Sequence, residues 1–271
     1  MDALPVHWLR THHGALQVFE HGGHIATWTP HGRAPVLWLS PQSRFAPGEA
    51  IRGGIPVIFP WFGDDPERRG RPAHGFARRI PWRLVELAAA HAQFESTDDA
   101  HTRSLWPHAF AMRLGVEITA ALTITLTIHN RDQSPFRCEP ALHTYFAVGD
   151  VRQARVHGLE GVTFLDKVDG MKRKVQSAAP LTLTGETDRV FVGAPARLEI
   201  EDPVLMRRIR VSTIGLRSAI VWNPGAAKAA KMGDVGDAWS GFLCAESGNV
   251  AEDALTIAAG DSAMMQLRIE V

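Results

Sequence analysis

The clearest pattern in the chain is an alternation of apolar and polar positions over residues 116–128. Apolar residues occupy every second position, and threonine fills most of the positions between them. A period of two places successive side chains on opposite faces of a strand, and β-branched residues favour that conformation. The run therefore predicts one long β-strand or two strands that share a bend. The same alternation returns at the C-terminal end, over residues 263–271.

Shorter apolar runs bounded by glycine, proline and aspartate predict further strands along the chain. They lie at residues 16–19, 24–29, 35–39, 82–87, 93–96, 181–183, 197–201, 209–212, 218–222 and 242–246. Helical periodicity is scarce, and residues 226–232 suggest one or two turns at most. No linker or low-complexity segment divides the chain. We therefore expect residues 1–271 to form a single all-β domain, a large antiparallel β-sandwich with a loop-borne site.

Charge narrows the possible binding partners, and cysteine content indicates the cellular compartment. The chain has 29 Lys and Arg residues against 29 Asp and Glu residues, which leaves no basic footprint for nucleic acid or an anionic membrane. The sequence has no signal-peptide pattern and no apolar run of about 18 residues that could span a membrane. Two cysteines, Cys138 and Cys244, predict no disulfide framework and fit a reducing compartment. We expect a cytoplasmic monomer.

Residues 51–63, IRGGIPVIFPWFG, and residues 74–78, HGFAR, form the first stretch that suggests a ligand site. Paired glycines permit a tight turn or a close approach of the backbone to a ligand. Prolines and aromatic residues stiffen the segment that follows them. Arg52 and Arg78 are permanent cations beside it, and His74 is titratable. This combination favours an anionic polar ligand that lies over aromatic rings.

His143 and Glu246 are the candidates for proton transfer. The apolar neighbours of His143 could exclude water and tune its imidazole near neutrality. A half-buried histidine that bonds its neighbours is the simpler interpretation, and the local sequence favours it. Glu246 ends an apolar run just before Ser247 and Gly248. It either points into solvent or faces a cleft as a general base, and only the tertiary fold could bring it to His143.

Asp166 and the remaining histidines give weaker signals. Asp166 could accept hydrogen bonds from sugar hydroxyls, or it could be a hairpin carboxylate paired with Lys167, a contact worth little when exposed. The sequence lacks the P-loop, G-x-G-x-x-G, H-E-x-x-H and G-x-S-x-G motifs. The closely spaced His21 and His24 have no neighbouring carboxylate or cysteine ligands, so metal chemistry has little local support.

Seven motifs, taken in order, resemble the aldose-1-epimerase superfamily and, within it, the hexose-6-phosphate mutarotases (glucose-6-phosphate 1-epimerases). They are residues 51–63, residues 74–78, LHTYF at 142–146, LDK at 165–167, VWNP at 221–224, residues 228–234 and CAE at 244–246. One such motif is weak evidence, whereas seven in the family's order are specific. The resemblance implies an isomerase with the galactose-mutarotase type of β-sandwich and neither a metal nor an organic cofactor.

The resemblance also implies roles for individual residues. By position, it makes His143 and Glu246 catalytic, Arg52 and Arg78 substrate-binding, and His74 and Asp166 polar residues of the sugar site. Three positions depart from the pattern of relatives and bear on the shape of the pocket. Ala73 stands where a polar residue is frequent, Ser247 replaces a proline, and Gly225 replaces a bulky residue.

The function implied is interconversion of the α and β anomers of an aldohexose 6-phosphate. Glu246 would act as the base and His143 as the acid, while arginines hold the phosphate. Three alternatives stay open: an aldose 1-epimerase acting on unphosphorylated sugars, a non-catalytic carbohydrate-binding β-sandwich, and a metal-dependent enzyme. The last would use His74, His143 and Glu246 as ligands.

Overall fold

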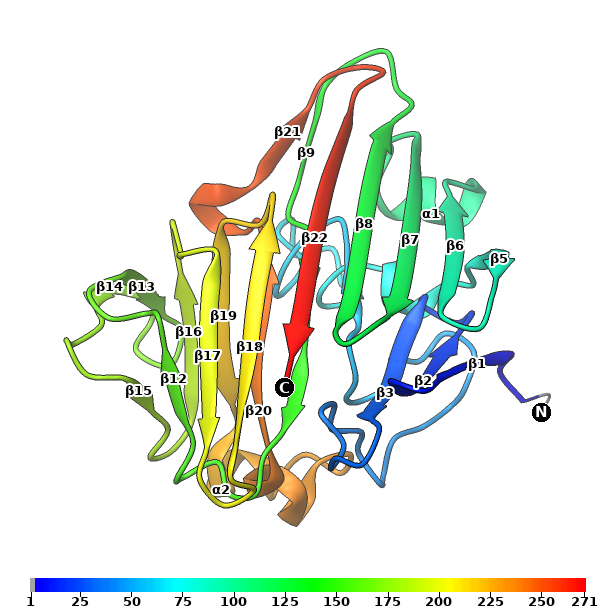
Figure 1. The fold of residues 1–271 in the computed structure, drawn as a ribbon. Helices are drawn as coiled ribbons and strands as arrows, with labels where there is room; N and C mark the ends of the chain where they lie inside the picture. Colours follow the sequence, from blue (N-terminus) through cyan, green and yellow to red (C-terminus); the bar gives the residue numbers. More distant parts are fainter. Residues whose placement is uncertain (1–2) are drawn as a thin grey trace.

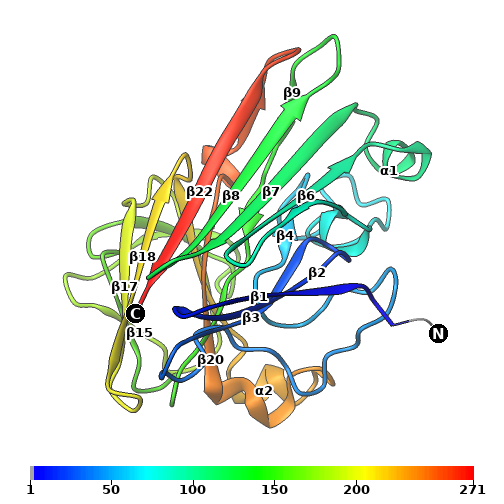
Figure 2. The ribbon, with the colours of Figure 1, turned by 45° about the vertical axis from the view of Figure 1, so that its right-hand side comes forward.

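The computed structural model describes residues 3–271, and antiparallel β-sheet dominates it (Figure 1). Two large sheets, of nine and eight strands, face each other, and a three-stranded sheet packs beside them at the N-terminal end (Figures 1 and 2). The expected large antiparallel β-sandwich is confirmed. None of the helices in residues 3–271 is long and apolar enough to cross a membrane.

The nine-stranded sheet contains both alternating runs predicted from the sequence. Residues 116–128 fold as a hairpin in which Val116 lies opposite Ile124, and the C-terminal strand pairs with the second arm. In spatial order the strands are β15 (Leu181–Thr182), β12 (Arg155–His157), β17 (Arg197–Asp202), β18 (Arg207–Ile214), β22 (Ser262–Glu270), β8 (Leu122–Asn130), β7 (Phe110–Ile118), β6 (His91–Thr97) and β5 (Arg83–Leu87).

The eight-stranded sheet carries Glu246 on one of its strands and holds His143 in the link between two others. In spatial order its strands are β14 (Lys172–Val175), β13 (Thr163–Asp166), β16 (Thr187–Phe191), β19 (Ser218–Asn223), β20 (Phe242–Gly248), β10 (Ala141–Leu142) and β4 (Val57–Ile58), with β11 (Tyr145–Ala147) also paired to β20. Most of these strands are short, and several were not predicted because a run of two to four residues has no measurable period.

The smaller elements complete the fold. They are β1 (Val6–Thr11), β2 (Gly14–Phe19), β3 (His24–Pro30), β9 (Phe136–Cys138), β21 (Leu255–Ile257), α1 (Ala100–Leu105), α2 (Gly225–Ala229) and the 3-10 turns η1 (Ala77–Arg79), η2 (Gly236–Gly241) and η3 (Ala251–Asp253). The strand predicted at 35–39 is wrong, because Leu37 and Leu39 make isolated bridges there. The helical turns predicted at 226–232 overlap α2. Helix α1 was missed although Asp99 and Thr102 form a capping box.

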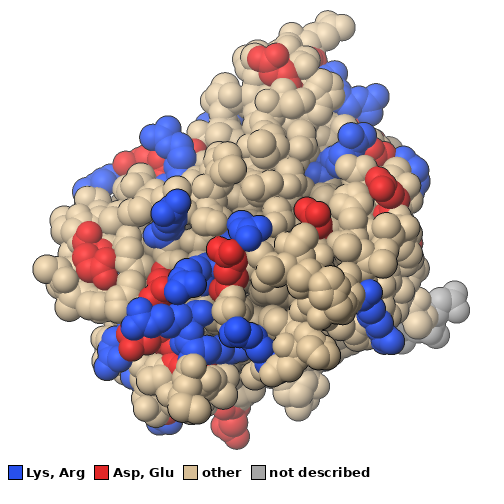
Figure 3. Space-filling model, in the orientation of Figure 1, with Lys and Arg blue, Asp and Glu red and all other residues tan. Residues whose placement is uncertain are grey.

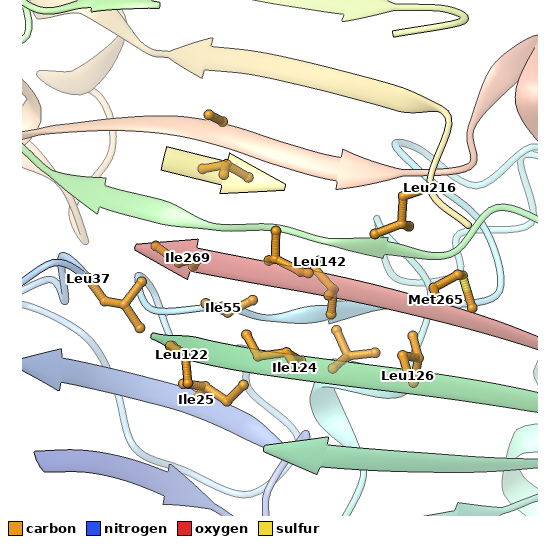
Figure 4. Packing of buried hydrophobic residues seen from close by; sticks show 14 of the residues in the cluster. Ile25, Leu37, Ile55, Leu122, Ile124, Leu126, Leu142, Leu216, Met265 and Ile269 are labelled. Atoms are coloured by element: carbon orange, nitrogen blue, oxygen red, sulfur yellow. The ribbon is translucent and has the colours of Figure 1, made fainter. Parts of the chain in front are cut away.

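The hydrophobic core lies between the two large sheets (Figure 4). Leu122, Ile124 and Leu126 of β8 point inward toward Ile55 and Leu142, and all five are buried. The threonines that alternate with them lie on the outer face of the sheet. The period-two pattern therefore arises because one face of the strand is buried and the other is solvated.

Strand β20 is buried along its whole length, because the eight-stranded sheet is covered on both faces where β20 runs. Leu243 and Ala245 belong to the main core. The alternate residues, Phe242, Cys244 and Glu246, therefore point to the opposite face. A smaller aromatic cluster that includes Phe242 and Cys244 covers that face. The fold thus sets a carboxylate in an apolar layer outside the main core.

The outer face of the nine-stranded sheet carries charges of both signs. Over β17 and β18, basic and acidic side chains lie side by side (Figure 3), and Glu199 pairs with both Arg208 and Arg210. A hollow of about 660 Å³ on this face is lined by His157, Arg197 and eight further residues. It contains none of the motif residues, so we place the site elsewhere.

Candidate active site

The fold brings His143 and Glu246 together. Leu142 pairs with Ser247, and Tyr145 pairs with Cys244, so the link between β10 and β11 holds His143 beside the end of β20. Nε2 of His143 lies 3.4 Å from Oε1 of Glu246, and the two side chains are 7% and 2% exposed. Neither a glutamate that points into solvent nor a half-buried histidine that hydrogen-bonds its neighbours describes this geometry. The two candidate proton-transfer groups face each other.

Burial shifts the pKa of both groups toward their uncharged forms. Desolvation, with smaller contributions from His74, Arg78 and Arg52, lowers the pKa of His143 well below 6.5. Desolvation raises the pKa of Glu246 well above 4.5. Within residues 3–271, Nδ1 of His143 and Oε2 of Glu246 have no hydrogen-bond partner. A buried pair with free polar atoms and shifted pKa values is suited to exchanging protons with a ligand.

Aromatic rings surround the imidazole of His143. The ring of Tyr145 stacks on it at 4.7 Å between centroids, with 6° between the planes. The rings of His74 and Trp222 approach edge-on, at 5.6 and 6.2 Å. These contacts exclude water and restrict rotation of the imidazole. Sugar rings also bind on aromatic faces of this kind, since their C–H faces are apolar.

Arg52 is oriented from two sides. Its Nε donates to Oδ2 of Asp234 at 2.8 Å, and its Nη1 donates to the hydroxyl oxygen of Tyr145 at 3.0 Å. These interactions, with Tyr145 the larger, raise the pKa of Arg52. A cavity of about 350 Å³ opens beside Arg52 and Asp234. The guanidinium is therefore a fixed positive charge at an opening.

Gly54 lets the loop that carries Arg52 pack tightly against its neighbour. Its φ is +61°, in the left-handed region, and a Cβ there would collide with the carbonyl oxygen of Ile25. Glycine is the residue that meets both conditions. The paired glycines of the motif thus provide close packing of the backbone, and Arg52 is placed as a result.

Arg78 and His74 approach the pair from the second motif. Arg78 lies in η1, and its Nη2 donates to the carbonyl oxygen of Ala73 at 2.9 Å. Desolvation lowers the pKa of Arg78 to about 10, so the guanidinium keeps its charge at neutral pH. Ala73 holds this arginine through its backbone, which any residue could provide.

His74 adopts a left-handed backbone conformation, with φ of 63°. Its Nδ1 accepts from the backbone N–H of Gly63 at 3.3 Å. Desolvation, followed by the charges of Arg78 and Lys167, lowers its pKa well below 6.5. The neutral ring therefore carries its proton on Nε2, where it can donate to a ligand. A strained backbone at a non-glycine residue is frequent at functional sites.

Asp166 does not join this group. It pairs with Arg189 in the sheet, whereas Leu165, Val190, Ile220 and Glu246 follow one another across the opposite face. Its Oδ2 accepts from Nζ of Lys174 at 2.8 Å, and its Oδ1 accepts from the backbone of the following turn. Asp166 is thus a hairpin carboxylate, although its partner is Lys174 and not the expected Lys167.

Lys167 and Asp188 are candidate site residues that the sequence reasoning missed. Asp188 lies opposite Trp222 in the sheet, on the face that carries Glu246, and Lys167 binds its carboxylate at 3.1 Å. Lys167 also lies 5.5 Å from the ring of Phe62. Desolvation raises the pKa of Asp188. Lys167 belongs to the motif at residues 165–167, but Asp188 lies in the five-residue strand β16, which shows no alternation of polar and apolar residues.

Two of the three departures from the family pattern do not line the pocket. Ser247 lies opposite Leu142 and Ala219, so its side chain points away from the face of Glu246. Gly225 has φ of +62°, and a Cβ there would lie 2.6 Å from the backbone nitrogen of Glu186. A bulky residue is excluded by this packing, and glycine here shapes the turn beneath the site.

Metal-ligating atoms also meet at this place. Ligand atoms of His143, Cys244 and Glu246 lie within 4.8 Å of one another. Burial raises the pKa of the Cys244 thiol well above 9, which keeps it protonated and poorly suited as a ligand. The arrangement fits proton transfer better than metal binding.

Comparison with known proteins places this geometry in a family. The model of the family described as aldose 1-epimerase matches residues 6–270. The chain belongs to the aldose 1-epimerase family. This match covers nearly the whole chain, including every residue of the site described above. The members of this family are isomerases, and the expectation of an isomerase is therefore confirmed.

Individual relatives narrow the comparison. A protein of Escherichia coli that carries the provisional name glucose-6-phosphate 1-epimerase is 38% identical over 236 residues, which cover 85% of this chain and 78% of that one. A Cenchrus ciliaris protein with the same provisional name is 32% identical over 259 residues, covering 90% of this chain and 78% of its own.

Solved structures confirm the fold. The crystal structure of a provisional mutarotase from Salmonella typhimurium superposes with a TM-score of 0.92 at 32% identity, covering all of this chain and 91% of that one. A galactose mutarotase related enzyme from Lactobacillus acidophilus superposes with a TM-score of 0.79 at 13% identity, covering 98% of this chain and 97% of that one. The second likeness concerns the fold alone, which is the galactose-mutarotase type expected.

Proposed function

We propose that this chain is a glucose-6-phosphate 1-epimerase, which interconverts the α and β anomers of an aldohexose 6-phosphate. The observation that carries the proposal is the buried pair of His143 and Glu246, 3.4 Å apart and close to the fixed cation Arg52. The pair supplies an acid and a base, and the cation suits a phosphate. The provisional names of the relatives agree with this substrate.

Anomers interconvert when the sugar ring opens and closes again. Glu246 removes the proton from the anomeric hydroxyl, and His143 delivers a proton to the ring oxygen as the bond between that oxygen and C1 breaks. The aldehyde then rotates about the bond between C1 and C2. Closure on the other face reverses both proton transfers, which regenerates the pair. Each positioned group contributes about 10²–10⁴-fold to the rate.

The phosphate also supports the acid role of His143. The charges of Arg78 and Arg52 are among the causes that lower the pKa of His143. A bound phosphate dianion offsets these charges and so raises the pKa of the imidazole toward its ordinary value. Protonated His143 therefore becomes more available when a phosphorylated substrate is bound.

In the proposed site, the arginines bind the phosphate and other polar residues bind the sugar. Nε and Nη1 of Arg52 are used by Asp234 and Tyr145, which orients the guanidinium and leaves Nη2 for a phosphate oxygen. Arg78 adds a second charge from η1. In this proposal His74, Lys167 and Asp188 hydrogen-bond the sugar hydroxyls, and Asp166 lies outside the site.

The proposal also covers the domain organisation, oligomeric state and cellular location of the protein. We propose a single domain over residues 1–271 that acts as a monomer in the cytoplasm, where sugar phosphates are held and thiols stay reduced. The buried, unpaired Cys138 and Cys244 agree with a reducing compartment.

Anomer exchange provides a direct test. Freshly dissolved α-glucose 6-phosphate is mixed with the protein, and the approach to the anomeric equilibrium is followed by NMR beside unphosphorylated α-glucose. We expect equilibration much faster than the spontaneous rate for the phosphorylated sugar and a far smaller effect on glucose. Equal acceleration of both sugars would indicate an aldose 1-epimerase, and acceleration of neither would contradict an epimerase.

A further inference from the structure

Tyr145 contacts both halves of the proposed site. It is the one tyrosine in the sequence, and its side chain is 1% exposed. Its hydroxyl oxygen accepts a hydrogen bond of 3.0 Å from Nη1 of Arg52. Its ring lies parallel to the imidazole of His143, at 4.7 Å between centroids. One rigid side chain therefore joins the cation at the anion end to the candidate acid.

The backbone holds Tyr145 from the same two directions. Its N–H donates to the carbonyl oxygen of Gly54, and its own carbonyl oxygen accepts from the N–H of Trp38, both at 2.9 Å. On the other side it pairs with Cys244 in β20, two residues before Glu246. The position of the ring is thus fixed by the Arg52 loop and by the catalytic strand.

Packing closes the remaining space around the ring. Trp38 stacks at 5.8 Å, and Trp222 and Phe242 lie 6.1 and 5.4 Å away. In such a setting a phenylalanine would pack equally well, and a hydroxyl needs a specific partner. Arg52 is that partner. Desolvation raises the pKa of Tyr145, so the phenol stays protonated and does not serve as a base.

We propose that Tyr145 is a positioning residue that fixes the guanidinium of Arg52 and the imidazole of His143 relative to each other. One substrate molecule must reach both groups at once, with its phosphate on Arg52 and its ring oxygen beside His143. The distance between these two ends is set by the sugar itself, so a rigid link between the two protein groups favours the 6-phosphate. This inference rests on the proposed function.

Two variants separate the two contacts. Tyr145→Phe keeps the stacked ring and removes the hydroxyl, so we expect KM for α-glucose 6-phosphate to rise about 10-fold with kcat within 2-fold, and KM for glucose to stay unchanged. Tyr145→Leu also removes the stacking, so kcat should fall for both sugars. Calorimetry measures the binding of inorganic phosphate independently of turnover. This binding should weaken about 10-fold in both variants.

Phe146→Leu is the matched control, because Phe146 lies on the same strand but points into the main core. A purely structural role for Tyr145 would make Tyr145→Phe resemble this control, with a lower melting temperature and an unchanged KM for both sugars. That result would overturn the inference. An equal rise of KM for glucose and glucose 6-phosphate would overturn it as well.

The wild-type protein separates this inference from the proposed function. If wild type prefers the phosphorylated sugar and Tyr145→Phe keeps that preference in full, the role of Tyr145 is wrong and the proposed function stands. If wild type shows no preference and binds inorganic phosphate no better than Arg52→Ala does, the proposed function fails, and the role of Tyr145 is overturned with it.

Discussion

The imidazole of His143 and the carboxylate of Glu246 approach to 3.4 Å in surroundings that disfavour charge on either group. Desolvation is the largest cause of both pKa shifts. A solvent-exposed pair would rest as an ion pair with its proton already committed. Burial instead favours protonated Glu246 and neutral His143, and the proposed mechanism begins once a proton has passed from Glu246 to His143.

Removing either group should nearly abolish anomerisation. Glu246→Gln and His143→Ala should each lower kcat by about 10²–10⁴-fold, as the loss of a positioned acid or base does. NMR with α-glucose 6-phosphate measures the rate, and circular dichroism confirms that the fold is kept. A rate close to that of wild type in either variant would remove that residue from the mechanism.

Glu246→Gln should also remove a pH-dependent cost in stability. Burial raises the pKa of Glu246 above 4.5, so the folded state binds its proton more tightly than the unfolded state. The folded state is therefore destabilised by Glu246 as pH rises above about 4.5 and through the folded-state pKa. We expect the variant to melt no lower than wild type at pH 7, with its relative advantage disappearing near pH 4. Destabilisation at pH 7 would contradict this account.

Asp188 should add to the rise that burial causes in the pKa of Glu246. His143, Arg78, Lys167, Cys244 and Asp188 are the titratable or charged groups around this carboxyl. Asp188 raises its pKa, while Lys167 and Arg78 lower it. Asp188→Asn removes the first effect and frees Lys167, and both changes lower the pKa of Glu246.

The limb of the pH–rate profile that follows Glu246 should therefore move to lower pH in Asp188→Asn. A ¹³C NMR titration of the glutamate carboxyl, assigned by the signal lost in Glu246→Gln, gives the same pKa directly. Asp237→Asn changes an exposed aspartate and is the control. An unchanged profile, or a shift to higher pH, would show that Asp188 does not act on Glu246.

Arg52 should discriminate between phosphorylated and free sugars. Arg52→Ala removes a charged hydrogen-bond donor, so KM for glucose 6-phosphate should rise about 10–100-fold while KM for glucose changes little. Arg83→Ala removes an exposed arginine that pairs with Glu95 in the far part of the nine-stranded sheet, and should change neither constant. Equal effects on both sugars would contradict the phosphate assignment.

The sequence predicted the architecture well where a strand has one buried and one solvated face. Residues 116–128 and 263–271 alternate over many positions, and both lie in the nine-stranded sheet. The eight-stranded sheet is covered on both sides around β20, so its strands do not alternate in polarity. Pattern alone missed its short strands β4, β10, β11, β13, β14 and β16, and it also missed β1, β9, β12 and β21 outside this sheet.

Strand register explains why the sequence identified some residues of the candidate site and not others. His143, Glu246, Arg52, Arg78 and His74 were found through motifs, and the fold groups them. Asp166 and Asp188 could not be told apart, because a carboxylate on a strand reaches one face or the other by a shift of one residue. Only the cross-strand register shows that Asp188 faces Glu246 and Asp166 does not.

Activity should not depend on a metal ion. In the proposed mechanism His143 and Glu246 provide both proton transfers, and burial raises the pKa of the Cys244 thiol well above 9. Prolonged treatment with a chelator should leave the rate of anomer exchange within about 2-fold, because acid–base catalysis needs no further group. Loss of the rate, and its recovery on addition of one divalent metal, would support a metal-dependent enzyme, with Cys244 in place of the expected His74 beside His143 and Glu246.

Gly54 offers a test of how the Arg52 loop is held. Gly54→Ala forces an L-residue into the left-handed region and drives a methyl group into the carbonyl oxygen of Ile25. Strain and overpacking together should lower the free energy of unfolding by about 3 kcal/mol or more. Gly32→Ala is the matched control, because Gly32 has φ of +68° with open space around it, and should cost about 1–2 kcal/mol.

Urea denaturation measures the free energy of unfolding of both variants, and enzyme kinetics show whether the loop still positions Arg52. If Gly54 serves close packing that places Arg52, the folded Gly54→Ala protein should show a raised KM for glucose 6-phosphate, whereas Gly32→Ala should keep the wild-type value. Equal losses of stability in the two variants would mean that the left-handed backbone alone explains the glycine, and the loop would then owe its position to other contacts.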